Sequence, residues 1–238
     1  YRTTNSGINW VLVFQQSGGK INSIWMRNNV SGFMAGNPVG GRWSLWKTAN
    51  GGVSWDSTGL YLPQASGETG FRNSLAVMNN TVIFGTNNSR IYRSTNLGLN
   101  WTFMITPEQN SSAVWNYWDT LYNTYTLSGG RSINATTNFG LNWVLNPCPD
   151  TNAIVGFCPA YYGVLMNAPM GKYAVRNNSK IYYAGFGNTF INEYTAPAGN
   201  YNHIAYDVMV MYSMLTFGVR SNGGITKISL FRGGEIRN

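Results

Sequence analysis

Carboxylates are the side chains through which this chain would most readily do chemistry, and there are only eight of them: Asp56, Glu68, Glu108, Asp119, Asp150, Glu193, Asp207 and Glu235. Hydrolysis of a glycosidic bond by the ordinary route needs two carboxylates that face each other about 5 to 10 Å apart. Glu68, Glu108 and Asp119 fall in or near loops that lead into expected strands, so they are the candidates for such a pair. Their spacing does not demand catalysis, and we therefore predict a protein that is not an enzyme.

The nucleophilic and metal-ligating side chains are equally sparse. His203 is the single histidine, and no Ser or Cys signature near it suggests a catalytic triad, so a hydrogen-bonded structural role is favoured. Cys148 and Cys158 lie ten residues apart and each precedes a proline. They are either two buried thiols or a disulfide that closes one loop. Two cysteines and one histidine predict no metal site, and no cofactor is expected.

One phrase returns four times along the chain, and we call it the box. The copies are "TTNSGINW" at 3–10, "TANGGVSW" at 48–55, "STNLGLNW" at 94–101 and "TTNFGLNW" at 136–143. Their glycines, Gly7, Gly52, Gly98 and Gly140, are 45, 46 and 42 residues apart. A degenerate fifth copy ends near residue 190, with Gly187 and Phe190 in place of the glycine and the tryptophan. Self-similarity at a period of about 20 to 50 residues is typical of solenoids and propellers.

The residue types of the box predict a turn followed by a packing anchor. The side chains of Asn5, Asn50, Asn96 and Asn138 can bond backbone amides within the turn, and the glycine supplies a positive φ that other residues resist. The closing tryptophans are expected to bury a large apolar area where neighbouring repeats meet, and they are Trp10, Trp55, Trp101 and Trp143.

The segments between the boxes are typical of short antiparallel strands. In "TVIFGTNNSRIYRS" at 81–94, two β-rich runs flank an Asn-Asn turn. About 45 residues for roughly four strands matches one blade of a propeller. We therefore predict an all-β chain, a five-bladed β-propeller of four-stranded antiparallel blades, formed by residues 1–238 as one domain. Its repeats would end near residues 10, 55, 101, 143 and 190.

The two ends of the chain are predicted to share one blade. "YRTTNSGINWVLVF" at the N-terminus contains the end of a third strand, a box and a fourth strand, whereas residues 215–231 supply two preceding strands without a box. Strands from both ends would then close the ring, and residues 231–238 would form a polar tail.

The box resembles the Asp-box, or BNR repeat, Ser/Thr-x-Asp-x-Gly-x-x-Trp/Phe, with Asn in place of Asp in all four clear copies. That family includes sialidases, xyloglucan-cleaving glycosidases, sortilin-type receptors and photosystem II assembly factor-like proteins, all β-propellers. Residues 36–64 look most like secreted assembly factor-like repeat proteins of Bacteroidota-type bacteria. The resemblance implies that the box is scaffold, a turn between the third and fourth strands of a blade that lies away from the ligand site. The Phe/Tyr-Arg-Ile-Pro motif of sialidases is absent.

Composition and charge point to an exported protein without a membrane span. Only 10% of the residues are charged, and hydrophobic residues make up 43%. The chain contains no run of 18 apolar residues, so we expect no transmembrane helix. The chain starts without an initiator Met or a signal peptide, which suggests the mature form of a longer exported precursor and an extracellular or cell-surface location. The net charge of +8 favours anionic partners, but the cations are scattered, so no specific nucleic-acid binding is predicted.

The loops that lead from each outer strand to the next inner strand are predicted to form the ligand site. They are residues 15–23, 62–74, 106–118, 147–157 and 195–203, and they are rich in Gln, Asn, Ser and Gly. Amide groups can both donate to and accept from sugar hydroxyls, and aromatic faces can stack on sugar rings. The candidate ligand-binding residues are Gln64, Arg72, Gln109, Trp115, Trp118, Tyr201 and His203.

Three classes of function remain open. The leading hypothesis is a secreted, non-catalytic propeller that binds a glycan or a protein at a cell surface or in an extracellular matrix. The alternative is a self-associating structural subunit of an extracellular filament, layer or virion. A glycosidase is the third, and it needs the facing pair of carboxylates.

Overall fold

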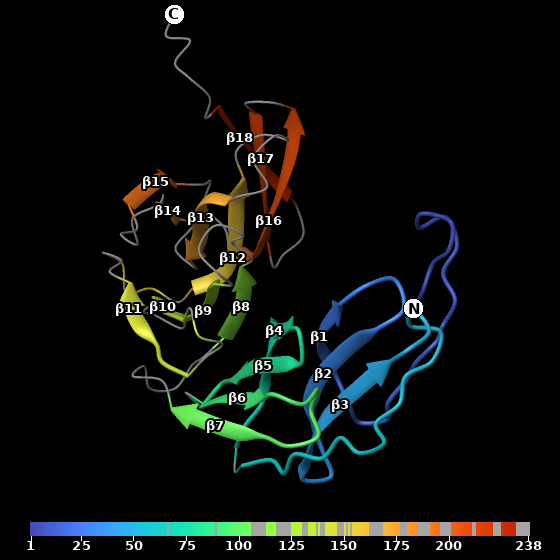
Figure 1. Ribbon diagram of the computed structural model, residues 1–238. Helices are drawn as coiled ribbons and strands as arrows, with labels where there is room; N and C mark the ends of the chain where they lie inside the picture. The colour runs from blue at the N-terminus through green and yellow to red at the C-terminus, as the bar shows by residue number, and fades with distance from the viewer. Residues whose placement is uncertain are drawn as a thin grey trace, which may run out of the picture. The chain divides into compact units, whose positions relative to one another are not determined.

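The computed structural model describes residues 1–65, 67–88, 90–105, 113–117, 125–129, 133–136, 138, 141–146, 150, 152, 154–161, 169–176, 180–184, 191–195, 201–210, 213–220 and 225–231. Over these ranges the chain forms antiparallel β-sheets and no helix (Figure 1). It divides into two compact units, Tyr1–Asn116 and Tyr117–Asn238. The expectation of an all-β chain is therefore confirmed.

The described strands form five sheets, in each of which neighbours in sequence are hydrogen-bonded. The first sheet is β1 (Ile21–Met26), β2 (Gly32–Val39) and β3 (Arg42–Thr48); the second is β4 (Gly70–Met78), β5 (Thr81–Thr86), β6 (Arg90–Ser94) and β7 (Thr102–Ile105). The third is β8 (Ala113–Tyr117), β9 (Tyr125–Gly129), β10 (Ile133–Thr136) and β11 (Val144–Asn146). The fourth is β12 (Ile154–Tyr161), β13 (Pro169–Arg176), β14 (Lys180–Ala184) and β15 (Ile191–Thr195); the fifth is β16 (Tyr201–Val210), β17 (Ser213–Arg220) and β18 (Ile225–Phe231).

Two of the four boxes connect a third and a fourth strand, the position that the resemblance implied. Residues 94–101 join β6 to β7, and residues 136–143 join β10 to β11. The predicted hairpin around Asn87 and Asn88 is also confirmed, since β5 and β6 flank it. Strands β17 and β18 occupy the two runs expected near the C-terminus.

The prediction of four strands in every sheet is wrong for the first sheet, whose described residues form three strands. The fifth sheet also has three strands among the described residues, and its predicted fourth strand from the N-terminal segment stays a prediction. In the first sheet, the segment after the box follows β3 but pairs with it only at its two ends, through Lys47 with Asp56 and Arg42 with Pro63. Between them, Thr58 donates backbone and side-chain hydrogen bonds to Asp56 Oδ1 at 2.9 and 2.6 Å, which lower the pKa of Asp56. Such a turn competes with a regular ladder, and Pro63 has no N–H to donate to one.

The hydrophobic core of the N-terminal unit lies between its two sheets. Trp43 of β3 packs edge-on against Phe84 of β5, with ring centroids 4.8 Å apart, and against Tyr92 of β6 at 5.9 Å. Leu60 and Leu62, from the irregular segment after β3, join this cluster. Strands β1 and β4, the first strands of the two sheets, lie side by side.

All five predicted loops run into strands. Residues 15–23, 62–74 and 147–157 end within β1, β4 and β12. Residues 201–203 were expected in a loop, but Tyr201 and His203 lie in β16, paired with Arg220 and Val219 of β17. Pairing with β17 starts as early as Tyr201, so β16 extends further towards the N-terminus than the loop composition indicated. Likewise, residues 113–117 belong to β8 rather than to the loop before it.

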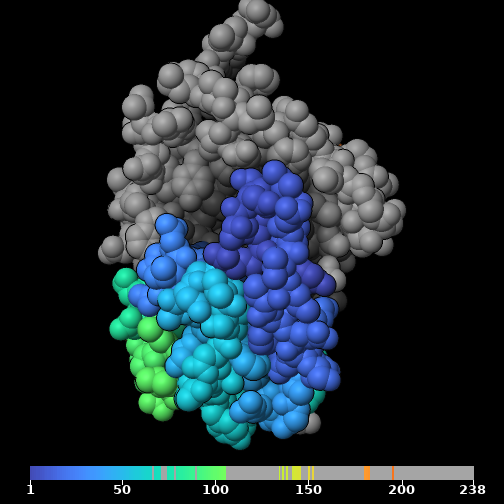
Figure 2. Space-filling model, turned by 90° about the vertical axis from the view of Figure 1, so that its right-hand side faces the viewer, coloured from blue at the N-terminus to red at the C-terminus, as the bar shows by residue number. Residues whose placement is uncertain are grey.

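The N-terminal residues form a box hairpin that lies against the first sheet. Arg2 and Val11 exchange backbone hydrogen bonds of 2.8 and 2.9 Å across it. The guanidinium Nε of Arg2 donates to the Gly51 carbonyl at 2.8 Å, and the Phe14 ring meets Trp46 at 4.7 Å. Figure 2 shows this segment (dark blue) beside residues that follow β3 (cyan). The hairpin therefore occupies the side of the first sheet opposite to the second sheet.

Gly98→Ala is expected to destabilise the chain more than Gly52→Ala. Both box glycines have positive φ, +88° and +77°, so an added Cβ costs each about 1 kcal/mol in backbone strain. At Gly98 the Cβ would also lie 2.9 Å from Leu60 and 3.1 Å from Phe33, whereas at Gly52 it would meet only the Trp55 ring at 3.5 Å. Crowding should add about 1–3 kcal/mol at Gly98. Urea unfolding of both variants measures the difference, and equal losses would contradict the packing described for Gly98.

Candidate functional site

The four boxes share one hydrogen-bonded turn. In the box at 94–101, Ser94 Oγ accepts from the backbone N–H groups of Gly98 and Asn96 at 2.8 and 3.3 Å and donates to Asn96 Oδ1 at 2.9 Å. Asn96 Oδ1 also accepts from the Asn100 N–H at 2.9 Å. Thr3, Thr48 and Thr136 open the other three turns in the same manner. The predicted role of the box asparagine is therefore confirmed.

The tryptophans of the boxes depart from the prediction. Trp10 is exposed, and Trp55, Trp101 and Trp143 are only partly buried. The indole N–H of Trp10 and that of Trp101 donate back to the carbonyl of their own box glycine, at 3.0 and 2.9 Å. This bond holds each ring over its own turn. The Trp10 ring stays exposed there, whereas the Trp101 ring also packs against the core cluster and meets Phe84 at 5.3 Å.

The boxes at 48–55 and 94–101 also bond to the hairpin turn at the same end of their sheets. The Gly51 N–H donates to the carbonyl of Val30 between β1 and β2, and the Leu97 N–H donates to Asn80 between β4 and β5, at 2.8 and 2.9 Å. In these antiparallel sheets the loops between sheets and the β2–β3 and β5–β6 turns must lie at the opposite end. In the first two sheets the boxes therefore lie at one end, and the loops predicted to bind a ligand lie at the other.

An amide network supports the loop end of the first two sheets. Asn37 Oδ1 on β2 accepts from Asn22 Nδ2 on β1 at 2.6 Å and from the Gly70 N–H at the start of β4 at 3.0 Å. Asn87 Oδ1 accepts from the Thr69 N–H at 2.7 Å. These amides fix the backbone around the entry to β4, and Gln15, Lys20, Arg42 and Asn88 remain exposed around them.

Glu68 is the carboxylate at this end, and it is completely buried. It accepts from Tyr92 Oη at 2.8 Å, from Arg90 Nη1 at 2.9 Å and from Thr86 Oγ1 at 3.4 Å. The hydrogen bond to Tyr92 and the charge of Glu68 raise the pKa of Arg90. Burial, together with the neighbouring carboxylate, raises the pKa of Tyr92. Arg90 also lies over the Phe103 ring at 4.5 Å. The cluster is a closed ion pair that pins the loop before β4 to the third strand of its sheet.

The same arrangement recurs in the fourth sheet. Asp150, also buried, precedes β12 as Glu68 precedes β4, and its Oδ2 accepts from Tyr182 Oη at 2.8 Å. Tyr182 is the third residue of β14, and Tyr92 is the third residue of β6. We call each of these two contacts, Glu68 with Tyr92 and Asp150 with Tyr182, an acid–tyrosine clamp. Sequence reasoning missed both clamps, although the matching runs "RIY" at 90–92 and "KIY" at 180–182 were visible.

The residues predicted for ligand binding are dispersed over several strands and loops. Arg72 lies in β4, Trp115 in β8, and Tyr201 and His203 in β16. Gln64 Nε2 donates to the Glu68 carbonyl at 2.9 Å, so this amide braces its own loop. Gln109 and Trp118 lie outside the described residues, as do Gly140 of the fourth box and Cys148 of the possible disulfide. Cys158 lies in β12.

The three carboxylates proposed for a glycosidase pair are not brought together in the described part of the chain. Glu68 is sealed by its partners, and Glu108 and Asp119 lie outside the described residues. Across the described residues, His, Cys, Asp and Glu side chains nowhere gather in groups of three or more that could ligate a metal ion. In that same part of the chain, no helix has the length and apolar character needed to cross a membrane.

No protein-family model and no curated protein matches the sequence. The structure, however, is similar to solved β-propeller proteins. One is YCF48 bound to D1 peptide, with a TM-score of 0.60 and 14% identity, covering 87% of this chain and 62% of that one. Another is the GH74 enzyme of Niastella koreensis, with a TM-score of 0.60 and 16% identity, covering 87% of this chain and 38% of that one. A third is BBS1N in complex with ARL6DN, with a TM-score of 0.62 and 9% identity, covering 96% of this chain and 68% of that one.

These likenesses define the class of protein: the chain is a β-propeller. The identities are too low to say more than the fold, and this chain spans only 62% of the YCF48 chain. Binding and scaffolding are the uses that the fold itself suggests, because a propeller presents clustered loops on a rigid ring.

Tyr92→Phe is expected to cost about 1–3 kcal/mol of unfolding free energy at pH 7, because it leaves Glu68 without one buried hydrogen bond. The folded state raises the pKa of Tyr92, so the proton on this hydroxyl stabilises the fold below about pH 10, and that contribution is lost as the pH rises further. The difference between wild type and Tyr92→Phe should therefore shrink above pH 10. Chemical unfolding at pH 7 and at higher pH measures it, with Tyr61→Phe, at an exposed tyrosine, as the control. A difference that does not change with pH would contradict this role.

Proposed function

We propose that this protein is a five-bladed, Asp-box type propeller that serves as a non-catalytic binding module for a glycan or a protein at a cell surface or in an extracellular matrix. The loop end of the sheets is the binding surface, and the boxes hold the opposite end rigid. An exported protein, which the resemblance of the boxes to secreted repeat proteins of Bacteroidota-type bacteria implies, would reach that location.

Five sheets and an unpaired box hairpin support the five-blade proposal. Within the described residues the fifth sheet has three strands, and residues 1–14 form a box hairpin that belongs to none of the five sheets. In the proposed ring, residues 10–14 add the fourth strand to β18, which would cover apolar side chains of Trp10, Val11 and Leu12 that are exposed on the hairpin.

The observation that carries the binding proposal is the character of the loop end in the N-terminal unit. Its exposed side chains are amides and cations, including Gln15, Asn88, Lys20 and Arg42. Its carboxylate, Glu68, is neutralised by Arg90 and withdrawn from solvent. Such a surface can donate and accept hydrogen bonds and attracts acidic groups, which suits a polar or anionic partner.

The clamp also supports a protein without glycosidase activity. A general acid or nucleophile must reach its substrate, and Glu68 cannot do so because it is buried and already has three hydrogen-bond partners. YCF48 has been solved with a bound peptide and BBS1N with a protein partner, so propellers of this shape do bind proteins. A protein partner is therefore considered on the same footing as a glycan.

A glycan array with neutral and acidic polysaccharides, read at low and at physiological salt, tests the proposal. Binding that persists at physiological salt and falls with Arg72→Ala, Trp115→Ala or Arg42→Ala is the expected result. Arg27→Ala is the matched control, since Arg27 is an exposed cation in the turn at the box end of the same sheet. Both Arg42→Ala and Arg27→Ala remove one charge, so only a site at the loop end distinguishes them.

Other outcomes discriminate between the remaining functions. Equal losses for Arg42→Ala and Arg27→Ala, or binding that disappears with salt, would reduce the interaction to non-specific attraction by the net charge of +8. If no glycan on the array binds, a protein remains as the candidate ligand. Release of reducing ends from xyloglucan would contradict the non-catalytic assignment.

A further inference from the structure

The box at 48–55 contains a chemically labile pair of residues. Its asparagine, Asn50, is followed by Gly51, whereas the other three boxes have a residue with a side chain at that position. Asparagine that precedes glycine is prone to deamidation, because glycine has no side chain to keep its backbone nitrogen from the asparagine amide carbon. Asn50 is also exposed, so this turn is a candidate for chemical modification.

The fold requires glycine at this position of the box. Gly51 has a φ of +69°, and Ser6 and Leu97, at the same position of two other boxes, have φ values of +56° and +55°. At Gly51 an added Cβ would in addition lie 2.7 Å from the backbone carbonyl oxygen of Asn29, in the β1–β2 turn. A backbone atom cannot rotate away as a flexible side chain can. The close approach of this box to the turn therefore selects the labile sequence.

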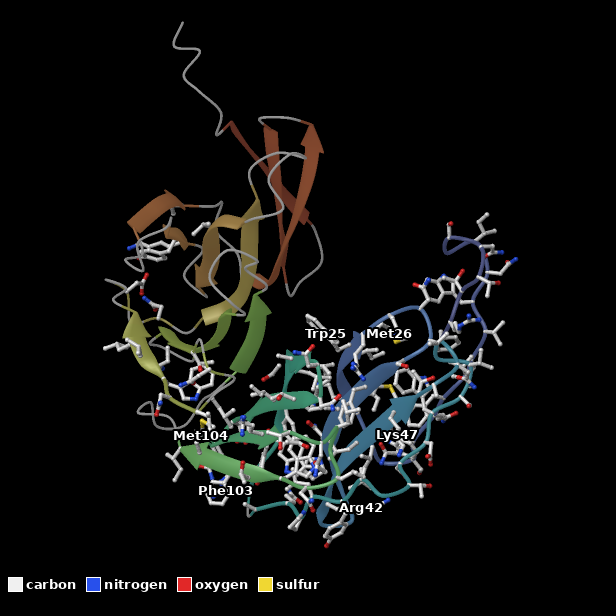
Figure 3. All side chains as sticks on the ribbon, in the orientation of Figure 1. Trp25, Met26, Arg42, Lys47, Phe103 and Met104 are labelled. Carbon is white, nitrogen blue, oxygen red and sulfur yellow. The ribbon has the colours of Figure 1, made fainter. Side chains whose placement is uncertain are left out.

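The same close approach occupies the backbone nitrogen that would react. The Gly51 N–H donates to the Val30 carbonyl of the β1–β2 turn at 2.8 Å. Arg2 of the N-terminal hairpin donates from Nε to the Gly51 carbonyl, also at 2.8 Å. Lys47, which directly precedes the box, lies towards the opposite end of β3 from Arg42 (Figure 3). At this end of the first sheet the box is thus held between two neighbouring segments.

The side chain of Asn50 is held as well. Its Oδ1 accepts from the Ser54 N–H and from Thr48 Oγ1, each at 3.0 Å, and its Nδ2 donates to Ser54 Oγ at 2.9 Å. Deamidation requires the Gly51 nitrogen to lose its proton and to reach Cγ of Asn50. Both groups must first leave these partners, so the intact box opposes the reaction.

We propose that Asn50 is a deamidation site that the native fold keeps closed, and that it opens when the box at 48–55 leaves the β1–β2 turn and the N-terminal hairpin. In the open state the Gly51 nitrogen forms a bond to Cγ of Asn50, and the bond from Cγ to Nδ2 breaks. The proton lost from the nitrogen leaves with Nδ2 as ammonia. The cyclic imide then takes up one water molecule, and opening at either carbonyl gives aspartate or isoaspartate at position 50.

Either product changes the box. Aspartate keeps an oxygen that can accept from the Ser54 N–H, but it loses the hydrogen bond from Nδ2 to Ser54 Oγ and adds one negative charge. Isoaspartate also lengthens the backbone before Gly51 by one carbon, which disturbs the bond from Gly51 to the Val30 carbonyl. Deamidation would therefore mark chains in which this end of the first sheet has opened. The site lies at the box end, so it is separate from the proposed binding surface.

Peptide mass spectrometry of the full chain, incubated at physiological pH with and without urea, tests the proposal. Cleavage after Lys and Arg gives residues 48–72, whose one asparagine is Asn50, and residues 221–227, whose one asparagine, Asn222, also precedes two glycines. Fragment ions distinguish Asn50 from Gln64 in the first peptide. We expect Asn50 to deamidate about tenfold or more slowly in the native chain than in urea, because only the open fraction reacts. In urea, Asn222 gives the rate of the same sequence without protection.

Arg2→Ala should raise the native rate at Asn50 about threefold or more, because it removes a hydrogen bond that must break on opening. Arg27→Ala is the matched control for charge, since Arg27 is an exposed cation in the β1–β2 turn. Tyr92→Phe is the control for global stability, because it weakens the fold in the second sheet. Both controls should leave the rate within about twofold of wild type, since neither residue bonds the box.

Three results would overturn the proposal. The first is an equal rate at Asn50 in the native chain and in urea, which would show that the fold gives no protection. The second is an effect of Arg2→Ala no larger than that of either control, which would assign the change to charge or to global unfolding. The third is a rate at Asn50 far below that at Asn222 in urea, which would show that the sequence is not labile. Circular dichroism confirms that each variant is folded before the rates are compared.

Discussion

The hydroxyl group that opens each box is the contact on which the sheets depend. Thr3, Thr48, Ser94 and Thr136 each bond the asparagine of the same box, which in turn holds the end of the turn. The bonds reverse the chain between the third strand and the segment that follows it, and the adjacent N–H groups of Gly51 and Leu97 tie the turn to the first hairpin of the sheet. The turn itself is thereby fixed by local hydrogen bonds, and in two repeats a further bond to the first hairpin holds the same end of the sheet.

The opposite end is fixed by long-range contacts. The acid–tyrosine clamp joins a loop residue to a strand 24 or 32 residues later, through Glu68 with Tyr92 and Asp150 with Tyr182. In a chain with only eight acidic residues, using two of them for buried structural contacts leaves few for catalysis. The clamp thus connects the architecture with the proposed function, since it makes the loops rigid and withdraws their acids from solvent.

Much of the fold could be predicted because the repeat and the turn chemistry are local. The box spacing indicated the repeating sheets, and the Asn-Asn pair at 87–88 indicated the β5–β6 hairpin. The missing fourth strand of the first sheet was not predictable in the same way, because it reflects competition between a ladder with β3 and the turn at Asp56 and Thr58. The exposure of Trp10 was missed because a tryptophan normally indicates burial, whereas its N–H bonds its own turn.

The sequence by itself determined the all-β class, the turns of the boxes and the scarcity of charge, because each follows from residue types within a few positions of one another. The position of two boxes between third and fourth strands was implied by their resemblance to a known repeat. Only the tertiary structure decided which acids are buried, which tyrosines they meet and which apolar side chains remain in solvent. Those outcomes depend on residues far apart in the chain that come together when strands pair and sheets pack. Composition cannot distinguish a carboxylate that Arg90 and Tyr92 enclose from one that is free to act.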